Sequence, residues 1–171
     1  MFKSFVANHS APSKCGFTMI ELMITVTIMM LMLGGGIAAY IRFNDRQTLQ
    51  GASKQLETQM RSAQKKARVG DIPDGCDRLV DYRVSMVNGE NDIYTDATCT
   101  NQTIRVATTT LNSSITVNAD FMVAFKVLHG GVEYITGDGN VYLISETYQY
   151  QFRITPGGSI EGGTIENIPS P

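Results

Sequence analysis

The sequence lacks the short motifs that mark common enzyme classes. It has no nucleophile elbow, no dinucleotide-binding glycine fingerprint and no zinc-protease helix. Three consecutive glycines, Gly34–Gly36, are not followed by the Lys-Ser/Thr pair of a phosphate-binding loop. We therefore expect that the protein is not an enzyme and that it binds no cofactor.

Cysteine and histidine are scarce. The three cysteines are Cys15, Cys76 and Cys99, and the two histidines, His9 and His129, lie far from the last two of them. The spacing from Cys76 to Cys99 is not that of a metal site, so no metal centre is expected. In an oxidising compartment we expect these two cysteines to form a disulfide, since a strand pair around Asn88-Gly89 would make them near neighbours. A pair of free buried thiols is the alternative.

Charges of opposite sign are segregated along the chain. Residues 42–68 carry seven basic and two acidic groups, whereas residues 69–171 carry 13 acidic and 5 basic groups. The acidic C-terminal part, with no lysine or arginine after Arg153, argues against nucleic-acid binding. The basic segment suits contact with lipid phosphates or with an acidic neighbour.

Asp138 and Asn140 offer oxygen ligands, but no matching glutamate follows to complete a calcium loop.

Charge is missing altogether from residues 22–41. As a helix this run is about 30 Å long, the thickness of the hydrocarbon core of a bilayer. One carboxylate, Glu21, precedes it directly. A carboxylate in lipid costs about 2–3 kcal/mol or more unless it is paired, so Glu21 is a candidate functional residue.

Three interpretations compete for this apolar run. It is a secretory signal peptide cut near Ala38, a lipoprotein signal, or a retained helix whose leader is removed between Gly16 and Phe17. The lipoprotein signal is excluded because Cys15 precedes the apolar run instead of following it. Glu21 favours the retained helix, because an ordinary signal peptide gains nothing from an acid at the start of its apolar core.

The residues around the possible cut carry a recognisable pattern. The segment Lys14-Cys15-Gly16-Phe17-Thr18-Met19-Ile20-Glu21-Leu22 resembles the N-terminal signature of the prepilin family, which comprises type IV pilins and the pseudopilins of type II secretion. The resemblance covers about 25 residues. It implies that a prepilin peptidase cuts after Gly16 and methylates Phe17, and that Glu21 recognises a neighbouring subunit.

Proline is absent between Pro12 and Pro73, although many pilins carry a helix-breaking proline in this region. We expect Gly34, Gly35 and Gly36 to interrupt the helix instead, because each glycine costs a helix about 1 kcal/mol relative to alanine. We expect these glycines to serve either as a flexible point of the helix or as a place where neighbouring helices approach closely.

The pattern turns amphipathic over residues 42–69. Apolar side chains recur at spacings of three and four residues, as on one face of a helix that docks against a domain: Leu49, Ala52, Leu56, Met60, Ala63 and Ala67. Gly70 follows the stretch and is suited to end the helix.

Residues 70–171 read as a β-rich globular domain. Alternating apolar residues predict strands at 80–86, 93–99, 103–111, 121–128, 132–135, 141–144 and 147–154, with a turn at Asn88-Gly89. The glycine-, proline- and serine-containing stretch 156–171 is predicted to be a loop or loose tail. The fold class is therefore α+β, with a long N-terminal helix packed on an antiparallel sheet.

Together these patterns predict four parts: a leader (1–16), a transmembrane and assembly helix (17–41), an amphipathic helix (42–69) and the β-rich domain (70–171). The resemblance implies a structural subunit of a type IV pilus or pseudopilus. The many short strands of the domain look more like those of minor pseudopilins similar to the H subunit of type II secretion than like a major pilin. Expected partners are the prepilin peptidase, other pilin subunits in a homo- or heteropolymer, an inner-membrane assembly platform and membrane lipids. Lys3 and Lys14 favour a cytoplasmic N-terminus, with the domain outside.

Two other functions stay open at this point. A single-pass protein with an extracellular binding domain would not be processed at Gly16. A secreted protein with a removable signal peptide would begin near Ala39.

Overall fold

The computed structural model describes residues 16–128 and 131–168. The predicted leader therefore lies almost entirely outside the described residues, as do Cys15 and His129. The chain divides into two compact units, Met1–Ala39 and Tyr40–Pro171. We call the second unit the head.

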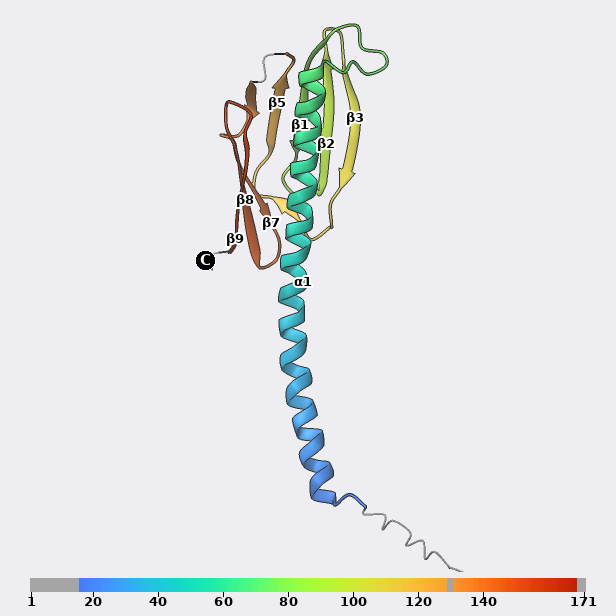
Figure 1. Cartoon of the computed structure of the whole chain (residues 1–171), viewed down its shortest axis with the longest axis vertical. Coiled ribbons are helices and arrows are strands. Elements are labelled where there is room, and N and C mark those ends of the chain that lie inside the picture. Colours follow the sequence, from blue (N-terminus) through green and yellow to red (C-terminus); the bar gives the residue numbers. More distant parts are fainter. Residues whose placement is uncertain (1–15, 129–130, 169–171) are drawn as a thin grey trace, which may run out of the picture. The chain divides into compact units, whose positions relative to one another are not determined.

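One helix, α1 (Met19–Val69), begins in the first unit and ends in the head. The predicted α+β class is confirmed, with this helix packed on antiparallel strands (Figure 1). The helix ends where the sequence predicts: Gly70 has φ +64°, and the amides of Gly70 and Asp71 donate to the carbonyls of Ala67 and Lys66 at 3.3 and 3.0 Å. This pair of bonds is the Schellman arrangement that glycine permits.

The predicted apolar stripe of α1 is confirmed as the helix's contribution to the head's core. Leu49, Leu56 and Met60 are 0% exposed. Ala52, Ala63 and Ala67 are buried with them and bring the backbone of α1 close to the strands.

The strands form two antiparallel sheets, whereas the sequence predicted one. The first sheet has the order β3-β2-β1-β5-β6 and the second the order β4-β7-β8-β9. Figure 1 shows the head half of α1 with β2 and β3 on one side and β8 and β9 on the other. The strand bounds are β1 Leu79–Met86, β2 Asp92–Cys99, β3 Thr103–Thr110, β4 Thr116–Val117, β5 Phe121–Lys126, β6 Val132–Thr136, β7 Asn140–Ile144, β8 Tyr148–Ile154 and β9 Ile160–Asn167.

The prediction of a loop or loose tail at 156–171 is wrong for Ile160–Asn167, because β9 pairs with β8 there. Residues 169–171 lie outside the described part of the chain. Gly162 and Gly163 suggested a loop, yet here they allow close approach. A Cβ at Gly162 would lie 2.5 Å from the hydroxyl of Tyr150, and one at Gly163 would lie 2.6 Å from the carbonyl oxygen of Gln151. These glycines are therefore required by the strand pairing and its irregular register.

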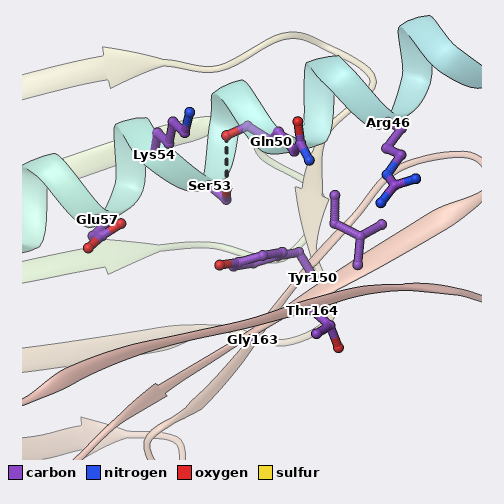
Figure 2. Close-up of a pocket in the computed structure, with 9 residues that line it drawn as sticks. Arg46, Gln50, Ser53, Lys54, Glu57, Tyr150, Gly163 and Thr164 are labelled. Atoms are coloured by element: carbon purple, nitrogen blue, oxygen red, sulfur yellow. Dashed lines mark hydrogen bonds between the residues drawn. The ribbon is translucent and has the colours of Figure 1, made fainter.

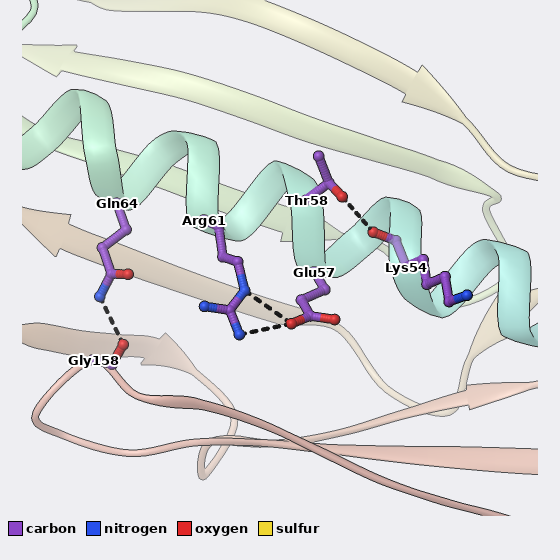
Figure 3. Close-up of polar contacts among 6 residues, drawn as sticks. All are labelled: Lys54, Glu57, Thr58, Arg61, Gln64 and Gly158. Atoms are coloured by element: carbon purple, nitrogen blue, oxygen red, sulfur yellow. Dashed lines mark hydrogen bonds and ion pairs between the residues drawn. The ribbon is translucent and has the colours of Figure 1, made fainter.

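Polar contacts join the head half of α1 to both sheets. The Gln59 side chain donates to the Thr109 hydroxyl of β3 at 2.9 Å. Gln64 donates to the carbonyl oxygen of Gly158, between β8 and β9, at 2.6 Å (Figure 3). Asp45 accepts from the hydroxyl of Ser145 and the amide of Thr147 at 3.1 and 3.2 Å. Together with the apolar stripe, these bonds hold α1 in one orientation on the strands.

Candidate functional site

The predicted cleavage point lies in a short segment before α1. Residues 16–18 have no regular secondary structure, and Phe17 is 80% exposed. The hydroxyl oxygen of Thr18 accepts a hydrogen bond from the amide of Glu21 at 3.3 Å. Thr18 is thus the N-cap. The helix α1 begins at Met19, two residues after the predicted start at Phe17. The bond between Gly16 and Phe17 therefore lies outside the helix and between exposed residues.

Glu21 lies in the first turn of α1 and is exposed. Over residues 16–128 and 131–168, no lysine or arginine lies within ion-pair distance of its carboxylate. The position is favourable for a negative charge, because the N-terminal end of a helix carries a partial positive charge. Glu21 therefore presents an available carboxylate where the apolar run begins.

The side chains that the structure describes along the apolar run are exposed all round the helix. Met23 is 70% exposed and Leu31 is 78% exposed. Its threonine hydroxyls are satisfied within the helix: Thr25 donates to the carbonyl of Leu22 at 2.9 Å, and Thr27 to that of Ile24 at 2.8 Å. A helix of this length and composition can cross a membrane.

The three glycines do not interrupt the helix, since α1 is continuous through Gly34, Gly35 and Gly36. A Cβ built at any of them would meet nothing within 4 Å. No packing among residues 16–128 and 131–168 thus explains these glycines. Their role in flexibility stays a prediction.

Cys76 and Cys99 form a disulfide with a Cα–Cα distance of 5.7 Å. It joins the loop after α1 to the end of β2. The sequence favoured this bond over two free buried thiols. The pairing of β1 with β2, which places Leu79 opposite Cys99, brings the loop and the strand end together.

The described residues contain no group of three or more histidine, cysteine, aspartate or glutamate side chains placed to hold a metal ion. Asp138 and Asn140 instead bond to each other in the turn between β6 and β7. The side-chain and backbone nitrogens of Asn140 donate to the Asp138 carboxylate at 3.1 and 3.0 Å. These hydrogen bonds lower the pKa of Asp138.

Asp81 is a buried carboxylate that the sequence did not single out. It is 1% exposed and lies 3.0 Å from Arg83 and 3.6 Å from Lys126. Lys126 also pairs with Glu133 at 2.6 Å. The hydrogen bond to Glu133, with the charges of Asp81 and Glu133, raises the pKa of Lys126. The cluster spans β1, β5 and β6 and is explained as an ion-pair network of the sheet.

A groove in the head was also not predicted. It has a volume of about 570 Å³ and lies between α1 and strands β8 and β9 (Figure 2). Arg46, Gln50 and Lys54 line it from the helix, and Tyr150 and Gly163 from the strands. The spacing of four residues between the three helical side chains was visible in the sequence, but the second wall depends on β9.

Comparison with known proteins gives one match. Residues 12–37 match the family model of the prokaryotic N-terminal methylation motif. No curated protein and no solved structure matches the chain. The matched segment contains the accessible Gly16–Phe17 bond and the available carboxylate of Glu21. The chain thus carries the N-terminal methylation motif that is the signature of type IV pilins and pseudopilins.

Proposed function

We propose that this protein is a structural subunit of a type IV pilus or of a type II secretion-like pseudopilus. The observation that carries the proposal is the combination of the methylation motif with a single acid at the start of an exposed apolar helix. A helix that exposes apolar side chains on every face needs lipid or other helices around it. Such a helix would be surrounded by lipid while the subunit is in the membrane, and by the helices of other subunits once it has joined a filament.

The first step is processing. A prepilin peptidase would cut after Gly16 and methylate the new amine of Phe17. The exposure of Phe17 and the lack of helix before Met19 support this step, because a peptidase needs its substrate backbone extended and free of helical hydrogen bonds. In this reaction the protein is the substrate and not the enzyme.

The second step is assembly. The cut creates a cation at Phe17, four residues before Glu21. In a bundle of parallel, staggered helices, the amine of an incoming subunit can meet the Glu21 carboxylate of the preceding one. The pair neutralises two charges in an apolar surrounding, and any other axial position leaves both unpaired at a cost of several kcal/mol. Pairing of this kind therefore sets the stagger between subunits.

The remaining partners follow from the same proposal. Residues 17–41 would anchor the chain in the inner membrane, with the N-terminus cytoplasmic and the head outside. A membrane platform and a separate cytoplasmic ATPase would then lift the subunit into the polymer. The three glycines would let the helix bend during this extraction.

The test is mass spectrometry of the N-terminus of the protein purified from the membrane fraction. We expect a mature chain that begins at methylated Phe17, and a Gly16→Val control that keeps Met1 because the branched side chain obstructs the cut. A wild-type chain that begins at Met1 would indicate a single-pass protein that is not processed. One that begins near Ala39 would indicate a removable signal peptide.

A further inference from the structure

The groove between α1 and β9 carries an excess of positive charge. Arg46 and Lys54 line it, and within the described part of the chain neither forms an ion pair. Glu57, the one acid on its wall, pairs with Arg61 at 2.7 Å. Figure 2 shows Arg46 extending from the helix toward the strands. The groove therefore suits a ligand with negative charge.

The strand side of the groove is partly apolar. Tyr150 and Ile165 are half-buried and pack against the core of the head. Burial raises the pKa of Tyr150, and the nearby charge of Glu57 raises it further, so its hydroxyl stays neutral and able to donate. An occupant that combines an acid with an apolar side chain would match both sides.

One segment of this chain has that combination. The loop after α1 reads Gly70-Asp71-Ile72-Pro73-Asp74. Ile72 is 55% exposed, and Asp74 is exposed with no ion-pair partner among residues 16–128 and 131–168.

The loop is held in its conformation by several bonds. The hydroxyl of Tyr82 donates to the carbonyl oxygen of Asp71 at 2.8 Å. The Cys76–Cys99 disulfide and a 2.6 Å hydrogen bond from Gln102 to the carbonyl oxygen of Gly75 anchor its far side. A segment that is ordered before it binds loses little entropy on binding. The loop is therefore a preformed projection.

The loop cannot reach the groove of its own molecule. Arg46 and Val69 both lie in α1, and at 1.5 Å per residue the helix separates them by about 35 Å. Contact between loop and groove thus requires two molecules displaced along the helix direction. If the copies lie parallel, each contact leaves one loop and one groove unoccupied at the two ends of the pair. The contact can then repeat from copy to copy and leads to an open chain.

We propose that the Asp71–Asp74 loop of one copy docks into the Arg46–Lys54–Tyr150 groove of a second copy. Asp74 then pairs with Arg46, and Ile72 lies against Tyr150. This contact rests on the proposed function, because membrane anchoring and assembly bring copies together in parallel. It adds a contact between heads to the contact that Glu21 makes between N-terminal helices.

Charge exchange tests the pairing in the full-length chain, expressed with its assembly machinery. We expect Asp74→Arg and Arg46→Glu each to lower filament yield about tenfold, because each places like charges opposite one another. The double variant restores yield to within about threefold of wild type. The matched controls, Lys65→Glu and Glu146→Arg, reverse exposed charges outside loop and groove and leave yield unchanged. Single variants that assemble normally, or a double variant that is not rescued, would overturn the contact.

A photo-crosslinking benzoylphenylalanine in place of Ile72 tests the geometry. We expect a crosslink, located by mass spectrometry, to residues 46–57 or 150–165 of another copy. Attachment elsewhere, or to a different protein, would overturn the proposal. If the wild-type chain keeps Met1, the proposed function itself fails. Chains that are processed at Gly16 and form filaments without this crosslink would overturn the head contact alone.

Discussion

The two halves of α1 differ in how their apolar side chains are distributed and buried, although they form one continuous helix. Before Arg42, apolar side chains cover all faces and are exposed, as at Leu31. After Arg42, apolar side chains follow a stripe, and Leu56 in that stripe is 0% exposed. The helix backbone is the same in both halves, so the difference lies in what each half meets.

A helix that packs against one partner needs one apolar face, and the other face is best made of charged residues. A helix surrounded by lipid or by other helices needs no such division. The first half therefore gains its stability from an environment outside the chain, and the second half from the strands of the head. Changes in the two halves should accordingly appear in different measurements.

The largest effect is expected from Glu21→Ala. Losing one partner of a charge pair in an apolar surrounding costs about 3–5 kcal/mol, so filament yield should fall at least 100-fold while mass spectrometry still finds Phe17 at the N-terminus. The matched change Glu146→Ala removes an exposed carboxylate from the head and should leave yield unchanged. Normal filaments from Glu21→Ala would contradict the assembly role of this acid.

The second largest effect is expected from changes to the apolar side chains of the two halves of α1. Leu56→Ala empties a fully buried site and should lower the free energy of unfolding of the head by about 2–5 kcal/mol. Leu31→Ala changes a side chain that is 78% exposed and should alter it by less than about 0.5 kcal/mol. Urea unfolding of the full chain in detergent, followed by the near-ultraviolet circular dichroism of the tyrosines, measures both. Equal losses would show that the first half also belongs to the head's cooperative unit.

The glycines give a smaller effect. Replacing Gly34, Gly35 and Gly36 by alanine should stabilise the helix locally by about 1 kcal/mol per site. Amide hydrogen exchange around these positions should slow, and urea unfolding of the head should not change. Gly51→Ala is the control, since it is equally open but lies in the half that packs on the strands, and it should stabilise the head. Unchanged exchange around residues 34–36 would mean that these glycines do not loosen the helix.

The smallest effect concerns alkaline pH. Tyr82 is 0% exposed, and burial, followed by the charge of Asp71, raises its pKa above the usual 10.0. The neutral phenol therefore favours folding below pH 10, and this contribution is lost as pH rises through the folded-state pKa. Tyr82→Phe should lower the free energy of unfolding by about 1 kcal/mol at pH 7, because the hydrogen bond to the carbonyl oxygen of Asp71 is lost. The variant's free energy of unfolding should also fall less steeply above pH 10.

Tyr40→Phe is the control for alkaline unfolding, because Tyr40 is 69% exposed. Its unfolding curve should follow that of the wild-type chain at every pH. Burial also raises the pKa values of Tyr134 and Tyr150. Tyr82→Phe should therefore remove only part of the fall in unfolding free energy above pH 10. A decline that is unchanged in Tyr82→Phe would show that ionisation of this phenol does not drive alkaline unfolding.

Short-range residue patterns in the sequence were enough to predict most of the helix and strands. The helical stripe from Leu49 to Ala67, the stop at Gly70 and seven strands were predicted, because each depends on residues within a few positions of one another. The short strand β4 and the strand β9 were missed. Gly162 and Gly163 have a strand role only because Tyr150 and Gln151, on the neighbouring strand, occupy the space beside them.

The sequence by itself determined the apolar length of residues 22–41, the isolated acid at Glu21 and the motif around Gly16. These features act through composition and helical rise and need no packed core. Only the tertiary structure decided the division into two sheets and the groove between Arg46 and Tyr150. Each of these joins residues far apart in the chain, and their distances are set by which strands pair, which no local pattern specifies.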